Sequence, residues 1–66
     1  SIYLDKDALE RMRAELTGFL REKKEISVAE FRDLAKTSRK FAVPLLEFFD
    51  GQKLTQRVGD KRVLRG

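Results

Sequence analysis

Two helical patterns in this sequence are separated by only two residues, Lys36 and Thr37. The upstream helix has a clear start, because Ser27 and Glu30 have the spacing of a capping box. The downstream helix follows the capping candidates Thr37 and Ser38. A connection this short makes consecutive helices cross at a sharp angle. The sequence therefore predicts a helix-turn-helix.

Another helical pattern precedes these two and runs from about Lys6 to Lys24. Asp5 can cap its start by accepting hydrogen bonds from the free N–H groups of the first turn. Apolar side chains recur at steps of three and four residues, which places them on one face of the helix. The members of this stripe are Leu9, Met12, Leu16, Phe19 and Leu20. Three helices can thus share one core.

The helix after the short connection contains the only proline of the chain, Pro44. We expect this helix from Ser38 or Arg39 to Phe49, with an end at Asp50-Gly51, where glycine suits a left-handed position just past the helix. A proline inside a helix removes a hydrogen bond and costs about 3 kcal/mol. Two outcomes are open: a distorted first turn, or a regular helix that begins near Pro44.

Beyond this helix the period changes from helical to alternating. Residues 54–58 alternate, Gly59-Asp60 is a tight-turn pair, and residues 61–64 continue after the turn. This pattern predicts a β-hairpin.

Two registers of the hairpin are compatible with the sequence. A two-residue loop places Arg57 opposite Arg62, a mildly repulsive arrangement unless an anion lies between them, whereas a three-residue loop pairs Arg57 with Val63. We favour the two-residue loop. A short strand at Ile2-Tyr3 or near Ile26 would complete the sheet.

Three helices with a helix-turn-helix and a C-terminal hairpin define an α+β fold, the winged helix. We expect residues 1–66 to form a single domain of this kind. In such a fold the third helix and the hairpin, called the wing, are the usual contact surfaces.

Charge is distributed unevenly along the chain. Residues 1–35 contain seven Lys or Arg against eight Asp or Glu, and residues 36–66 contain eight against three, so the net charges are −1 and +5. A one-sided excess of positive charge on a small domain is typical of a polyanion-binding protein, and nucleic acid is the leading candidate. The candidate contact residues, at the start of the third helix and on the wing, are Lys36, Thr37, Ser38, Arg39, Lys40, Arg57, Lys61 and Arg62.

Composition argues against several other functions. The sequence has no Cys and no His, which removes disulfides, thiolate nucleophiles, the usual zinc sites and imidazole bases together. We therefore expect no enzyme activity, no cofactor and no metal. With 41% hydrophobic and 39% charged residues and no apolar run of about 20, the chain is expected to be soluble, monomeric and without a membrane partner. A start without Met or a signal-peptide pattern indicates a fragment of a larger protein.

Three segments carry a resemblance to a known family. They are Phe31-Arg32-Asp33-Leu34, the run from Thr37 to Asp50 that begins Thr37-Ser38-Arg39-Lys40, and the wing from Thr55 to Leu64. Together they resemble the C-terminal winged-helix module of the bacterial selenocysteine-specific elongation factor, SelB. The resemblance covers about residues 26–65, and the first helix fits by pattern alone.

This resemblance implies tandem winged helices appended to a translational GTPase of the cytoplasm, the last of which binds the SECIS hairpin in selenoprotein mRNA. GTP hydrolysis, selenocysteyl-tRNA binding and contact with the ribosome would belong to the parent protein. The RNA contacts would fall on residues 37–40 and on the wing around Arg57 and Arg62. The family also carries a proline inside its recognition helix, as Pro44 is here.

Other functions remain possible for the same fold. A winged helix can insert its third helix into the major groove of DNA, or can serve only for protein interaction. The basic residues can also act merely as solubilising charges. RNA differs from DNA because the deep, narrow major groove of A-form helices excludes a helix, so an RNA-binding winged helix has to follow the phosphates.

Overall fold

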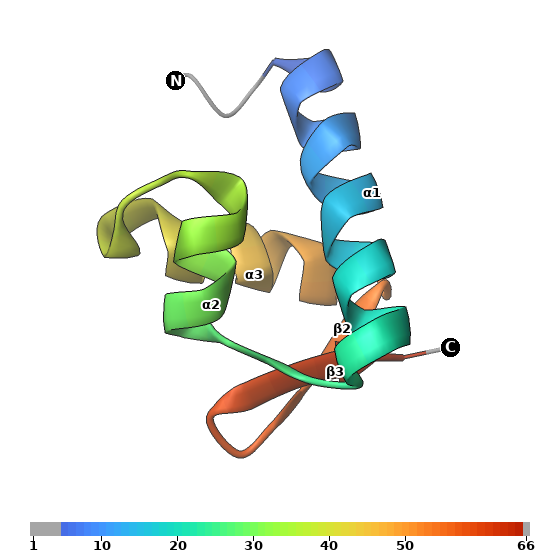
Figure 1. Cartoon of the computed structure of the whole chain (residues 1–66). Coiled ribbons are helices and arrows are strands. Elements are labelled where there is room, and N and C mark those ends of the chain that lie inside the picture. Colours follow the sequence, from blue (N-terminus) through green and yellow to red (C-terminus); the bar gives the residue numbers. More distant parts are fainter. Residues whose placement is uncertain (1–4, 66) are drawn as a thin grey trace.

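The computed structural model describes residues 5–65. Within them the elements follow the order α1 (Lys6–Lys23), β1 (Ile26–Ser27), α2 (Val28–Ala35), α3 (Arg39–Gly51), β2 (Thr55–Val58) and β3 (Lys61–Leu64) (Figure 1). This is the predicted α+β architecture of three helices and a hairpin, with β1 as an added strand. The strand near Ile26 is thereby confirmed, whereas the alternative at Ile2-Tyr3 lies outside the described residues.

Helix α1 begins and ends close to its predicted limits. The Asp5 carboxylate accepts a hydrogen bond of 3.0 Å from the backbone N–H of Asp7, as expected of an N-cap. The helix ends at Lys24, whose φ of 76° is left-handed and whose N–H donates to the Leu20 carbonyl. Leu16 and Leu20 of the apolar stripe are fully or almost fully buried.

Both hydrogen bonds of the predicted capping box are present at the start of α2. The Glu30 N–H donates to Ser27 Oγ at 3.1 Å, and the Ser27 N–H donates to Glu30 Oε1 at 2.9 Å. At its other end α2 closes on Lys36, which has left-handed backbone angles. Residues 36–38 then connect α2 to α3, which confirms the helix-turn-helix.

Helix α3 begins at Arg39, five residues before Pro44, so a regular helix that begins near Pro44 is ruled out. In the first turn the Ser38 carbonyl accepts from both the Phe41 N–H at 3.1 Å and the Ala42 N–H at 2.9 Å. The tighter of these two patterns is a 3₁₀-type bond. The proline is thus accommodated one turn further along, on an exposed face.

The end of α3 differs from the prediction. The helix continues through Gly51, and the left-handed position is taken by Lys53, with φ of 63°. The last carbonyls of the helix are satisfied by the N–H groups of residues 52–54. A glycine at a helix end is permissive of a left-handed angle but does not impose one, and here the turn closes two residues later.

The strands form an antiparallel sheet in the order β1-β3-β2. Arg57 lies opposite Arg62, and Val58 lies opposite Lys61, which confirms the two-residue loop. Gly59 has φ of +64° and is the only residue of the loop in the left-handed region. This pattern matches a type II′ turn, in which glycine occupies the first central position.

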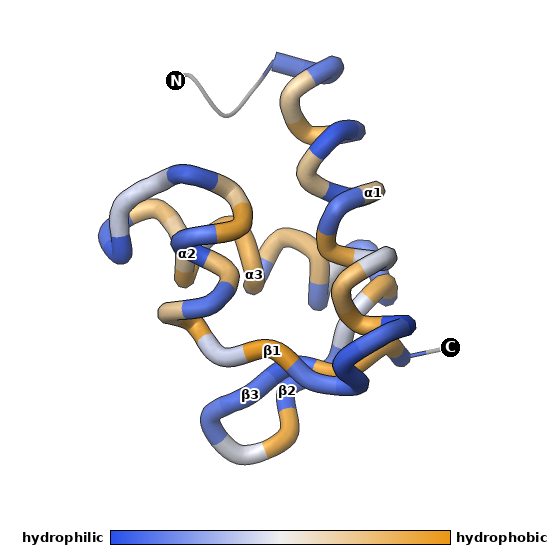
Figure 2. The backbone as a smooth tube through the Cα atoms, in the orientation of Figure 1, coloured by the Kyte–Doolittle hydropathy of each residue, from blue (hydrophilic) through white to orange (hydrophobic). Residues whose placement is uncertain are grey.

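A single hydrophobic core joins the three helices and β1. Its fully buried or nearly buried members are Leu16, Leu20, Ile26, Phe31, Ala42, Leu45, Leu46 and Phe49. In Figure 2, α1 changes between hydrophilic and hydrophobic residues along its length, whereas α3 is hydrophobic over most of its length. Across residues 5–65, no helix combines the length and apolar character that crossing a bilayer requires.

Candidate nucleic-acid interface

The connection between α2 and α3 exposes the first group of predicted contact residues. Lys36 and Ser38 are exposed, and Thr37 is partly buried, with its N–H donating to the Arg32 carbonyl at 3.1 Å. Ser38 is the N-cap of α3, and its side chain makes no capping hydrogen bond. Backbone hydrogen bonds to the end of α2 hold this connection, while Lys36 and Ser38 are exposed.

The first turn of α3 presents two further cations. Arg39 and Lys40 are both exposed, and this turn contains no acidic residue. The Lys40 Nζ lies 5.6 Å from the centre of the Phe41 ring, within the range of a cation–π interaction. The N-terminus of an α-helix adds free N–H groups and partial positive charge of its own. An anion therefore meets both side-chain and backbone positive charge at this point.

On the wing, Arg57 is exposed, and its Nε donates a hydrogen bond of 2.8 Å to the Gly59 carbonyl. This bond ties the side chain to the turn of the hairpin. The guanidinium is planar and carries five N–H donors, so it has donors to offer beyond the one at Nε. Arg57 is the wing residue whose position agrees best with the prediction.

Lys61 is on the wing as predicted, but it already has an anionic partner. Its Nζ lies 2.8 Å from Glu25 Oε2, and both side chains are about half exposed. The hydrogen bond and charge of Glu25, assisted by the charges of Asp60 and Glu30, raise the pKa of Lys61 above its usual 10.5. An RNA phosphate would have to compete with Glu25 for this lysine.

Arg62 is buried rather than exposed on the wing, which departs from the sequence-based expectation. Only 5% of the residue is accessible, and its Nε donates to both Asp50 oxygens, at 3.0 and 3.3 Å. Thr55 Oγ1 donates to the same carboxylate at 2.6 Å. The ion pair between Arg62 and Asp50 resolves the repulsion expected between the opposed Arg57 and Arg62.

Asp50 is the residue that the sequence reasoning missed, since it was considered only as part of a helix end. A signal for it was present, because the favoured hairpin register called for an anion near Arg57 and Arg62. Acidic residues are few in residues 36–66, and Asp50 is the one that lies nearest before the hairpin in the sequence.

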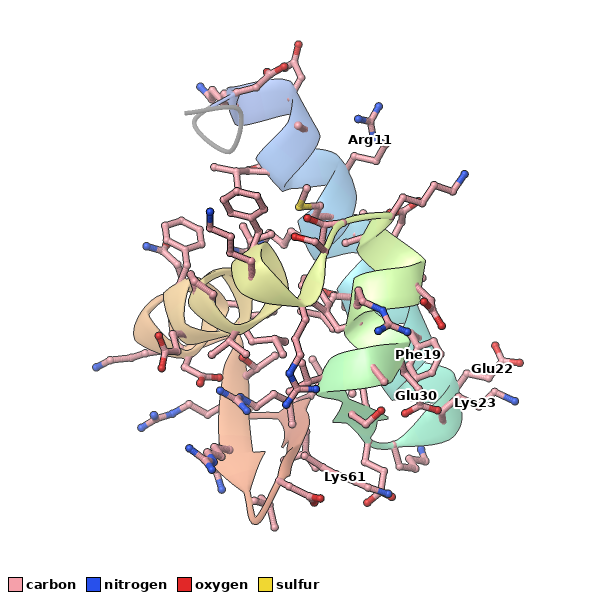
Figure 3. All side chains as sticks on the ribbon, turned by 90° about the vertical axis from the view of Figure 1, so that its left-hand side faces the viewer. Arg11, Phe19, Glu22, Lys23, Glu30 and Lys61 are labelled. Carbon is pink, nitrogen blue, oxygen red and sulfur yellow. The ribbon has the colours of Figure 1, made fainter. Side chains whose placement is uncertain are left out.

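The two segments that carry the exposed cations can both be seen from one side of the molecule. In Figure 1 the α2–α3 connection lies toward the left and the tip of the hairpin lies at the bottom. In Figure 3, which shows that side, α3 begins near the centre of the view and the hairpin lies below it, while Glu22 and Glu30 lie to the right, around the end of α1 and the start of α2. In this view the start of α3 and the hairpin lie one above the other, and these two acids lie to one side of them.

The exposed cations of the described residues form a candidate binding surface for an anion. No group of three or more His, Cys, Asp or Glu side chains that could hold a metal ion is present in residues 5–65. The described residues instead provide exposed cations at a helix N-terminus and on a hairpin, a combination suited to phosphate groups.

Three helices, a helix-turn-helix and a hairpin paired with a short first strand define a winged-helix domain. Residues 18–64 match the family model described as "Elongation factor SelB, winged helix". The chain is also 40% identical over 63 residues to the "Selenocysteine-specific elongation factor" of Desulfomicrobium baculatum, an alignment that covers 96% of this chain and 10% of that protein. The chain therefore belongs to the SelB winged-helix family. It spans about a tenth of the length of this relative.

Proposed function

We propose that this domain binds a structured RNA, the SECIS hairpin of selenoprotein mRNA, through the start of α3 and the wing. The observation that carries the proposal is the presence of exposed cations without acids in the first turn of α3, which is seen from the same side of the molecule as the wing (Figure 3). Arg39 and Lys40 lie in this turn, Lys36 lies just before it, and Arg57 lies on the wing. Ser38, whose side chain makes no capping hydrogen bond, adds a hydroxyl beside them. Membership of the SelB family supports RNA as the polyanion.

The cations act on phosphates, because the major groove of A-form RNA is too deep and narrow to admit α3. Phosphate contacts position a protein on nucleic acid but do not read the sequence. Selectivity then arises from the shape of the RNA hairpin. The start of α3 and the wing can bind at the same time only where the RNA places two sets of phosphates at the matching positions. Bases are read only where a loop or bulge exposes them.

Within this proposal the domain has no catalytic role. Residues 1–66 form one domain at the C-terminal end of a longer cytoplasmic translation factor and act as a monomer. GTP hydrolysis, selenocysteyl-tRNA and the ribosome are served by other parts of that protein. The domain contributes attachment to the message, which brings the factor to the correct codon.

The direct test is a binding titration by fluorescence anisotropy. A SECIS-type RNA hairpin and a DNA duplex of equal length are compared at the same salt concentration, because phosphate contacts make every affinity salt-dependent. We expect the RNA hairpin to bind more tightly. Equal or tighter binding of the DNA would instead favour a DNA-binding winged helix. Binding that is unaffected by combined Arg39→Ala and Arg57→Ala substitutions would favour a protein-interaction domain.

A further inference from the structure

We infer that Asp50 is a positioning residue, which fixes the wing relative to α3 so that both surfaces reach one RNA together. This inference rests on the proposed function, and it assigns the side chains that make that surface rigid. Asp50 does not itself face the RNA in this scheme. It acts through Arg62 and Thr55, which belong to the two long strands of the wing.

The contacts of Asp50 join three elements in one cluster. Its carboxylate accepts from Thr55 Oγ1 at 2.6 Å and from Arg62 Nε at 3.0 Å. Asp50 lies in the last turn of α3, Thr55 is the first residue of β2, and Arg62 lies in β3, the middle strand of the sheet. One side chain of the helix thus holds both strands of the hairpin.

Because this cluster is largely buried, its stability depends on the geometry of its hydrogen bonds. Thr55 is 1% exposed and Arg62 5% exposed, and the side chain of Asp50 is 27% exposed. Ion pairs on an open surface contribute little to stability. A desolvated pair with additional hydrogen bonds is sensitive to geometry, because losing one contact leaves a charge that neither water nor a partner solvates. The cluster therefore favours one angle between the hairpin and the helix.

The cluster controls the position of Arg57 through the hairpin. Arg57 lies directly opposite Arg62 and two residues beyond Thr55, on the same face of the sheet. A rotation of the hairpin about the end of α3 would move Arg57 relative to Arg39, at the other end of the helix. Affinity gained from two surfaces at once depends on their being preorganised, so such a rotation would weaken RNA binding.

Variants of Asp50 and Thr55 separate this role from simple stability. Asp50→Asn keeps the shape but removes the charge, Thr55→Val removes only the hydroxyl, and Thr55→Ser is the matched control that keeps it. We expect Asp50→Asn and Thr55→Val to weaken binding of a SECIS-type hairpin by about tenfold. We expect Thr55→Ser to bind like the unsubstituted domain. All titrations are made well below the unfolding temperature of each variant.

The decisive readout is a double-mutant cycle with Arg57→Ala. If Asp50 positions the wing, Arg57→Ala costs less affinity in the Asp50→Asn background than in the unsubstituted domain, because the arginine is already displaced. Additive losses would overturn the inference. Thr55→Val with the same cycle provides the answer should Asp50→Asn fail to fold.

The orientation of the wing is measured separately, from residual dipolar couplings of backbone amides in β2, β3 and α3. We expect the hairpin to change its orientation relative to α3 in Asp50→Asn and Thr55→Val and to keep it in Thr55→Ser. An unchanged orientation would overturn the inference. An unsubstituted domain that binds the RNA hairpin no better than DNA would overturn the proposed function, whereas variants that bind as tightly as an RNA-selective parent would overturn only the role of Asp50.

Discussion

Arg57 and Arg62 face each other across the hairpin, yet their side chains have opposite environments. Arg57 is exposed and bonded to the adjacent turn, and Arg62 is buried against Asp50. From the sequence the two were equivalent, since both are arginines on the wing. The difference arises from a contact between residues 12 positions apart, which only the packing of α3 on the sheet creates.

This difference predicts opposite responses to substitution. Arg62→Ala should lower the free energy of unfolding by about 3 kcal/mol, because it leaves the mostly buried Asp50 carboxylate without its cation. Arg57→Ala should change the same quantity by less than about 1 kcal/mol, since it removes one exposed hydrogen bond. Urea denaturation of the two variants makes the comparison. Equal losses of unfolding free energy in the two variants would show that burial of Arg62 does not determine its contribution to stability.

Arg39 is the residue whose removal should affect RNA affinity most clearly without affecting the fold. We expect Arg39→Ala to weaken binding of a SECIS-type hairpin by about 1 to 3 kcal/mol, with the thermal unfolding midpoint almost unchanged. The matched control is Arg21→Ala, which removes an exposed arginine from the last turn of α1. A similar loss of affinity in both variants would mean that net charge matters rather than position.

The Lys61–Glu25 ion pair predicts a pH-dependent contribution to stability. Because the pKa of Lys61 is raised in the folded state, the pair stabilises the fold at pH values below 10.5 and loses this effect as the pH rises through the raised value. Glu25→Gln should therefore have a lower unfolding midpoint than the unsubstituted domain at pH 8. The two midpoints should converge above pH 10.5. A difference that persists undiminished in strong base would exclude the ion pair as its source.

The helices, the strands and most of their ends followed from local signals, whereas the end of α3 did not. The capping box at Ser27 and Glu30, the short connection and the Gly59-Asp60 turn each specify backbone geometry within a few residues, and each is present in the structure. The left-handed residue after α3 was predicted at Gly51 but is Lys53, and Asp50 at this end of the helix contacts Thr55 of the sheet. No local pattern encodes such a contact.

Pro44 tests how far α3 depends on its own hydrogen bonds. It lies on the exposed side of the helix, where its ring contributes little to the core, and it removes the N–H that would bond to the Lys40 carbonyl. Pro44→Ala should raise the free energy of unfolding by about 2 kcal/mol, the restored helix bond outweighing the greater freedom of the unfolded chain. Thermal and chemical unfolding provide the measurement. A less stable variant would show that the proline fits the local backbone without cost.

Across the whole molecule, the sequence indicated which segments carry the proposed interface, but not which of their cations already have acidic partners. The excess of positive charge after residue 35 and the winged-helix topology were enough to indicate the start of α3 and the wing. They did not reveal that Lys61 forms an ion pair with Glu25 and Arg62 with Asp50, because these ion pairs join side chains that are distant in sequence. The net charge of a surface therefore overstates the number of cations that it can offer to a ligand.

Salt dependence measures that number directly. If all six predicted cations met phosphates, the logarithm of the binding constant would fall with the logarithm of salt concentration with a slope of about −4 to −5, at about 0.7 to 0.9 per contact. With Lys61 held by Glu25 and Arg62 buried, four cations remain and the slope should be about −3. Titrations of a SECIS-type hairpin between about 50 and 200 mM salt determine it. Arg39→Ala should make the slope less steep by about 1, whereas a slope near −5 would mean that RNA displaces the acidic partners of Lys61 and Arg62.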